Sequence, residues 1–229
     1  MSDHPHVIHC LTGSIAATLA VKLSRLYEAS GCTFEMVATS AATNFTEHRL
    51  KLLEDQNEWD SYASQATVLH IDLMKRADVL VIAPLTANTL AKLANGLADN
   101  LVTCIARAWP IGKPIVLAPA MNTHMWENPV TAEHLGRLRA RYGGSLTIVE
   151  PQAKVLFCGD SGIGAMAQAD HVVAAAIRPT PLTIIKRAQA ILAAHLPPDG
   201  IGEQDCINQL LGLLDGPDTL ALTHPPGKL

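Results

Sequence analysis

The segment around Cys158 combines a thiol with unusual backbone freedom. Phe157 and Cys158 are followed by Gly159, Gly162 and Gly164, so three glycines fall within six residues after the cysteine. This composition predicts a mobile loop or flap. Structural burial would not place a thiol on such a loop, and we therefore interpret Cys158 as a candidate reactive group.

Asn122 is the second candidate, because it is the one amide in a loop that carries two methionines and a tryptophan. Ala120, Met121, Met125 and Trp126 surround this single amide. Such residues could simply close the top of a core, but a flat apolar cofactor beside one polar anchor explains the mixture better.

His70 is the third candidate, and alone it is the weakest. It lies between apolar residues just before a continuous apolar run, where a histidine is more often part of the core than catalytic. Ser161 together with His70 could suggest a hydrolase, but the sequence contains no Gly-x-Ser-x-Gly elbow.

Small and hydroxyl-bearing residues recur where strands are expected to end. Gly13 and Ser14 follow the first expected strand, Thr39 ends the second and Ser40 follows it, and the range 86–89 follows the third. The hydroxyls can cap the helices that come next, or they can hold a phosphate at those helix N-termini. An acidic residue that would bind a ribose is missing after the second strand, which argues against NAD and is compatible with a phosphate or a flavin edge.

Alternating elements would bring these segments together. Short apolar runs alternate with helical patterns, which predicts an α/β fold with a doubly wound, Rossmann- or flavodoxin-like parallel sheet. The expected strands are Val7–Thr12, Thr33–Thr39, Asp78–Pro84, Pro114–Pro119 and Ser145–Val149. The expected helices are Ile15–Ser30, Asn44–Asp55, Thr86–Gly96, Asn100–Trp109, Thr131–Tyr142 and Ala167–Ile177. Ligands of such sheets bind at the carboxyl ends of the strands, where the candidates lie.

The composition predicts one domain over residues 1–178, followed by an extension over 179–229 that is helical and then a loose tail. The 229 residues and the 48% hydrophobic fraction suit a globular chain, and the net charge of −4 does not suggest a nucleic-acid partner. No apolar run reaches membrane-spanning length, and the beginning of the sequence lacks a signal pattern. The five cysteines are scattered without a Cys-x-x-Cys pair, so we expect neither disulfides nor a metal site. The same pattern leads us to expect a cytoplasmic protein.

In combination, the motifs resemble the flavin-containing cysteine decarboxylases. The resemblance runs from about residue 7 to 177, and the Met-Asn-x-x-Met-Trp stretch followed by Cys-Gly-Asp-x-Gly-x-Gly is its most specific part. It implies FMN as cofactor. The residues implied to hold it are Gly13, Ser14, Ile15, Thr39, Ser40, Ala41, Thr86, Ala87, Asn88, Thr89 and Ala120.

The same resemblance implies the other roles. His70 would be the active-site base, Asn122 would bind the substrate carboxylate, and Cys158 would be the proton donor. The backbone of Val155, Leu156 and Phe157 would clamp the substrate. The implied reaction is decarboxylation of 4′-phosphopantothenoylcysteine to 4′-phosphopantetheine in coenzyme A biosynthesis, through a thioaldehyde and an enethiol. Members of the family are homotrimers with FMN between subunits, so His70 is expected to act in a neighbour's site.

Two other functions remain open. One is a non-enzymatic regulatory subunit of a type-1 protein phosphatase, similar to halotolerance factors. The other is a peptide-cysteine decarboxylase, which only the shape of the substrate pocket would distinguish.

Overall fold

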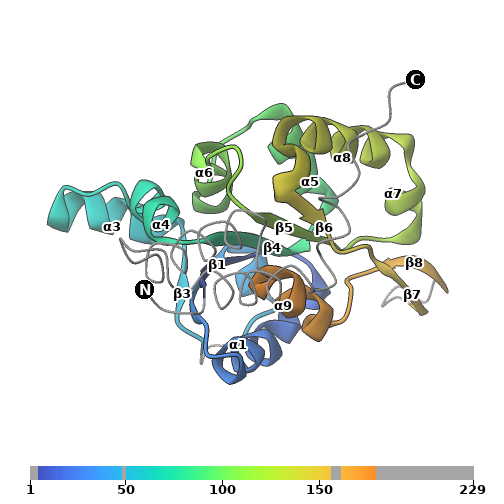
Figure 1. The fold of residues 1–229 in the computed structure, drawn as a ribbon, viewed down its shortest axis with the longest axis horizontal. Helices are drawn as coiled ribbons and strands as arrows, with labels where there is room; N and C mark the ends of the chain where they lie inside the picture. The colour runs from blue at the N-terminus through green and yellow to red at the C-terminus, as the bar shows by residue number, and fades with distance from the viewer. Residues whose placement is uncertain (1–4, 48–49, 156–160, 179–229) are drawn as a thin grey trace, which may run out of the picture. The chain divides into compact units, whose positions relative to one another are not determined.

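A six-stranded parallel sheet forms the centre of the computed structural model, which describes residues 5–47, 50–155 and 161–178 (Figure 1). The strand order is β3-β2-β1-β4-β5-β6, which is that of a doubly wound sheet and confirms the expected fold class. The strands are β1 (His6–Leu11), β2 (Thr33–Ala38), β3 (Leu52–Leu53), β4 (Val79–Leu85), β5 (Ile115–Pro119) and β6 (Leu146–Ile148).

Helices cover both faces of this sheet. The face with α1 and α9 buries Leu23 and Val172, and the opposite face, with α4, α5, α6 and α8, buries Leu90 and Ile105. The bounds are η1 (Ile15–Leu19), α1 (Ala20–Ala29), α2 (Ser40–Thr43), α3 (Asp55–Gln65), α4 (Leu69–Arg76), α5 (Ala87–Asn95), α6 (Leu101–Ala108), α7 (Thr123–Glu127), α8 (Pro129–Tyr142), η2 (Gly143–Ser145) and α9 (Ala169–Ile177). Every residue of β4 and β5 is buried, because side chains on both faces of a covered parallel sheet point into a core.

The expected helix over Asn44–Asp55 is wrong. Leu52 and Leu53 instead form β3, the edge strand that pairs with Met36 and Val37 of β2, and α3 begins only at Asp55. The leucines of this segment therefore cover a sheet edge and do not form one face of a helix.

The region around residues 152–165 forms a hairpin. β7 (Gln152–Val155) pairs antiparallel with β8 (Ser161–Ala165), so the second half of the expected flap is a strand. The predicted extension over 179–229 lies outside the described residues. Among the described helices, none is both long and apolar enough to span a membrane.

Candidate active site

The ends of β1 and β4 are tied together by Thr12, at the point where the strand order reverses. Its Oγ1 donates to the carbonyl of Pro84 (2.7 Å) and accepts from the backbone N–H of Thr86 (2.9 Å). The carboxyl ends of parallel strands lie at the same end of a sheet. The two hydrogen bonds of Thr12 therefore hold the segments after β1 and β4 side by side at that end.

Close packing of Gly13 against Ala41 brings the segment after β2 beside the segment after β1. A Cβ atom on Gly13 would lie 2.5 Å from the Ala41 Cβ, a distance that real atoms do not tolerate. Gly13 is therefore required for close approach of the two loops. Ser14, the next residue, caps η1 by accepting a hydrogen bond from Ala16 N (3.3 Å), and Ile15 is exposed.

Thr39 carries a buried hydroxyl at this edge that lacks a hydrogen-bond partner within the described part of the chain. An unsatisfied buried hydroxyl costs about 1–3 kcal/mol, so such groups usually have a ligand or water partner. Ser40 and Ala41 follow it as exposed residues of α2. The phosphate or ring edge of FMN would supply the missing partner, so these residues fit the cofactor.

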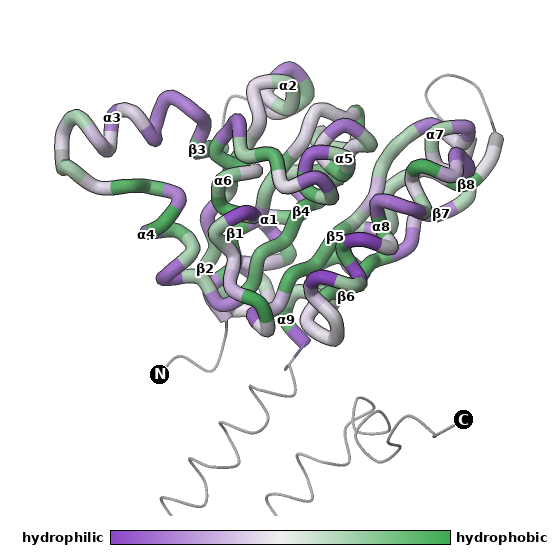
Figure 2. Tube along the Cα trace, turned by 90° about the horizontal axis from the view of Figure 1, so that it is seen from above, coloured by the Kyte–Doolittle hydropathy of each residue, from purple (hydrophilic) through white to green (hydrophobic). Residues whose placement is uncertain are grey.

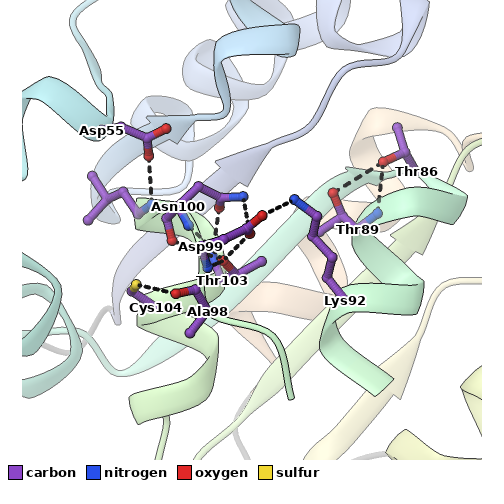
Figure 3. A network of polar contacts seen from close by, with 10 residues as sticks. Asp55, Thr86, Thr89, Lys92, Ala98, Asp99, Asn100, Thr103 and Cys104 are labelled. Atoms are coloured by element: carbon purple, nitrogen blue, oxygen red, sulfur yellow. Dashed lines mark hydrogen bonds and ion pairs between the residues drawn. The ribbon is translucent and has the colours of Figure 1, made fainter. Parts of the chain in front are cut away.

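The range 86–89 forms the N-terminal turn of α5. Thr86 is the N-cap, and its Oγ1 accepts from the N–H of Thr89 (3.3 Å) and contacts the Thr89 hydroxyl at 3.2 Å (Figure 3). Ala87 is half-buried and Asn88 is exposed. Ala120, which directly follows β5, is buried and donates its N–H to the carbonyl of Leu85 (2.9 Å). The structure thus places the predicted cofactor residues along one sheet edge.

Asn122 is the N-cap of α7, and the β7–β8 hairpin lies directly against it. The Asn122 Oδ1 accepts from the His124 N–H at 2.8 Å, and the Met121 N–H donates to the carbonyl of Gly164 at 2.9 Å. A Cβ on Gly162 would lie 2.6 Å from the side chain of Thr123, so this glycine is needed for the close packing. The base of the hairpin is consequently fixed beside Asn122.

Of the remaining predicted residues, only Val155 belongs to the described part of the chain. Val155 ends β7 opposite Ser161, whereas Leu156, Phe157 and Cys158 lie outside the described residues. Burial raises the pKa of the described cysteine thiols, which are Cys10, Cys32 and Cys104. These three thiols are therefore poor sources of thiolate.

His70 lies in the first turn of α4, where Glu58 of α3 holds it by two hydrogen bonds. One carboxylate oxygen accepts from the His70 backbone N–H, and the other contacts the ring Nδ1, both at 2.9 Å. Both side chains are largely buried, with exposed fractions of 24% for His70 and 19% for Glu58. His70 is thus neither a core histidine nor freely exposed.

Within residues 5–178, His70 lies far from Asn122. Figures 1 and 2 share their horizontal axis, and in both views α3 and α4 lie at one end of it while α7, β7 and β8 lie at the other. One chain therefore brings Asn122 and the hairpin together but does not bring His70 to them.

Two residues of this region were not predicted from the sequence. Thr12 was recognised only as the end of a strand, although its position at a strand end was a usable signal. Glu58 precedes His70 by twelve residues, a spacing that belongs to no local motif.

Comparisons with known proteins identify the family. The Flavoprotein family model matches residues 1–179. A phosphopantothenoylcysteine decarboxylase of Mus musculus is 40% identical over 190 residues, which cover 81% of this chain and 86% of that protein. One of Oryza sativa subsp. japonica is 44% identical over 170 residues, covering 72% and 76%.

Solved structures give the same result. A variant PPC decarboxylase complexed with pantothenoylaminoethenethiol has a TM-score of 0.68 at 42% identity, covering 73% of this chain and 93% of that one. The FMN binding protein AtHal3 has a TM-score of 0.66 at 43% identity, covering 73% and 92%. The resemblance inferred from the motifs is confirmed, and the chain belongs to the Flavoprotein family.

Proposed function

We propose that this chain is an FMN-dependent carboxy-lyase that converts 4′-phosphopantothenoylcysteine to 4′-phosphopantetheine in coenzyme A biosynthesis. The observation that carries the proposal is the strand-end site, whose Thr39 hydroxyl has no hydrogen-bond partner among the described residues, in a chain at least 40% identical to relatives named as this decarboxylase. The structure related to it at 42% identity was complexed with pantothenoylaminoethenethiol, an enethiol of the kind that the mechanism requires.

The strand-end residues suit FMN because they offer helix N-termini and hydroxyls rather than an acidic side chain. The residues predicted from the sequence to hold FMN would do so at the carboxyl end of the sheet, where Thr12 joins the ends of β1 and β4. When bound, FMN supplies a hydride acceptor that oxidises the carbon bearing sulfur and later returns the hydride.

The remaining steps fall to the chain's own side chains. The amide of Asn122 would bind the substrate carboxylate, since its N–H groups are suitable donors. His70 would accept a proton at Nε2, the ring nitrogen that Glu58 does not contact. Oxidation places a thioaldehyde beta to the carboxylate, so that carbon dioxide can leave with its electrons flowing onto sulfur. Cys158 would then donate a proton to the carbon that lost the carboxylate, and the backbone of 155–157 would clamp the substrate.

A homotrimer would unite the separated halves of this site. His70 of one subunit would act beside Asn122 of the next, because one chain keeps them at opposite ends. Trp59 and Tyr62 on α3 are each 66% exposed, and Val68 before α4 is 41% exposed. An apolar surface of this kind next to His70 suits contact with a second copy. The free thiols of Cys10, Cys32 and Cys104 suit a cytoplasmic location.

The product of the purified protein tests the reaction. The protein should be yellow, and mass spectrometry should find 4′-phosphopantetheine after incubation with 4′-phosphopantothenoylcysteine. A colourless protein that takes up no FMN would contradict the cofactor assignment. Turnover of a peptide ending in cysteine, without turnover of the pantothenate substrate, would instead identify a peptide-cysteine decarboxylase.

Mixing two inactive variants tests the shared site. His70→Asn and Asn122→Ala chains, unfolded and refolded together in equal amounts, should regain activity, because some interfaces pair an intact His70 with an intact Asn122. Random assembly makes about one interface in four intact, so we expect up to about a quarter of wild-type activity. Each variant refolded alone is the control. A mixture as inactive as its components would show that both residues must come from one chain.

A further inference from the structure

The carboxylate of Glu58 accepts two hydrogen bonds from the same residue, His70. Oε2 accepts from the backbone N–H and Oε1 contacts the ring Nδ1, each at 2.9 Å. The two groups come from different helices, so the contact depends on how α3 packs against α4. The sequence motifs that identify the reaction include His70 but not Glu58.

The helix that carries Glu58 is fixed at its first turn. Oδ1 of Asp55 accepts from the backbone N–H of Leu101 at 2.6 Å, which joins α3 to the start of α6 (Figure 3). The loop that leads into α6 is itself held by the 2.6 Å ion pair between Lys92 and Asp99. Glu58 is therefore presented to His70 from an anchored position.

An ionised carboxylate can only accept hydrogen bonds, so its contact with Nδ1 requires a hydrogen on that nitrogen. In the neutral ring, Nε2 then carries the lone pair and points away from Glu58. A glutamine at this position has one acceptor oxygen and one amino group. Because the two contacts use different oxygens of Glu58, a glutamine in the same geometry would present its oxygen to one N–H group and its amino group to the other.

We propose that Glu58 is a positioning residue for His70, which holds the imidazole in the tautomer with hydrogen on Nδ1 and so keeps Nε2 as the base. This inference rests on the proposed function for its catalytic consequence, but the tautomer itself follows from the contact. If Glu58 served only to cap α4, one acceptor oxygen would suffice, and Glu58→Gln would behave like the wild type.

The test compares Glu58→Gln and Glu58→Asp with Asp60→Asn in the FMN-loaded protein. Asp60 is an exposed carboxylate on the same helix whose side chain accepts from Gln56 (2.9 Å), so its variant changes the same charge without touching His70. Nitrogen NMR of histidine-labelled protein at alkaline pH reports the tautomer, and the His70→Asn spectrum assigns the His70 signals. In parallel, kcat and KM for 4′-phosphopantothenoylcysteine are measured.

We expect wild type and Asp60→Asn to carry hydrogen on Nδ1, and Glu58→Gln to carry it on Nε2 or to show a mixture. For Glu58→Gln, kcat should fall about 100-fold or more, as for loss of a general base, with KM changed by less than about threefold. Glu58→Asp keeps the charge but is shorter by one methylene, so its kcat should lie between those of wild type and Glu58→Gln.

Wild-type kcat in Glu58→Gln, or an unchanged tautomer, would overturn the inference while leaving the decarboxylase assignment intact. Absence of turnover in the wild type would instead contradict the proposed function, and the tautomer comparison would still decide whether Glu58 orients the ring. Equal losses in Glu58→Gln and Asp60→Asn would also overturn the inference, because they would show an effect of helix charge alone.

Discussion

His9 provides a quantitative test of how the core below the site is built. This residue of β1 is fully buried, and its ring is satisfied on both sides. Nε2 donates to the carbonyl of Ala83 at 2.6 Å, and the hydroxyl of Tyr27 donates to Nδ1 at 3.0 Å. Burial lowers the pKa of His9 to about 4, against a weaker opposing effect of the hydrogen bond to Ala83. The folded protein therefore holds this histidine neutral.

The sign and size of the effect on stability follow from linkage. The unfolded chain protonates His9 near pH 6.5, whereas the folded chain resists protonation until about pH 4, so the unfolded state binds more protons between these values. The free energy of unfolding must fall as the pH falls through this window. The loss reaches about 3 kcal/mol at pH 4 and about 2 kcal/mol at pH 5, at 1.36 kcal/mol per pKa unit.

Urea unfolding of wild type and His9→Gln at pH 7.5 and pH 5.0 measures this loss. The glutamine amide can donate to the Ala83 carbonyl and accept from Tyr27, but it does not titrate. Both proteins should be free of FMN and at one concentration, since cofactor and assembly change the apparent stability. The wild type should lose about 2 kcal/mol more than the variant between the two pH values. Equal losses would refute the assignment of a buried neutral histidine.

Three further changes test the strand-end site and the flap. Gly13→Ala should lower the unfolding free energy by about 1–3 kcal/mol through overlap with Ala41. As its control, Gly136→Ala on α8 adds a Cβ that meets no atom of another element within 4 Å and should raise the unfolding free energy by about 0.5–1 kcal/mol; urea unfolding that finds the same sign for both would contradict this. Thr39→Val should leave the apo protein at least as stable and weaken FMN binding about fivefold or more in a fluorescence titration; unchanged affinity would remove Thr39 from the site. Cys158→Ser should still release carbon dioxide but accumulate oxidised enethiol, and saturated product found by mass spectrometry would refute the role of Cys158.

The central strands were predictable because burial on both faces leaves a continuous apolar run, as in β4 and β5. The strand-end residues were predictable for a related reason, since ligands of this fold bind at the carboxyl edge. Gly13 and Thr86 therefore lie at the sheet edge where the sequence placed them. Their roles toward FMN stay predictions that the loading experiments test.

The region around His70 was not predictable, for reasons that lie in α3. This helix has no apolar face, and its two large hydrophobic residues, Trp59 and Tyr62, are exposed. Ala66, the residue that follows α3, has the left-handed conformation (φ 51°), where a glycine would normally mark the end of a helix. The capping pair Glu54 and Asn57 marks the start of α3, but no apolar face and no glycine mark its course and its end. The sequence therefore did not reveal that Glu58 contacts His70.

The distance between α4 and the β7–β8 hairpin has a consequence for the timing of activity. If each active site is divided between two chains, a newly made subunit is inactive. Its His70 belongs to one active site and its Asn122 to another, so a single chain contains no complete site. Decarboxylation then begins only when subunits meet, and specific activity should decline on dilution below the dissociation constant of the assembly. Thioaldehyde, a reactive species, would accordingly arise only inside a finished particle and never on an isolated chain.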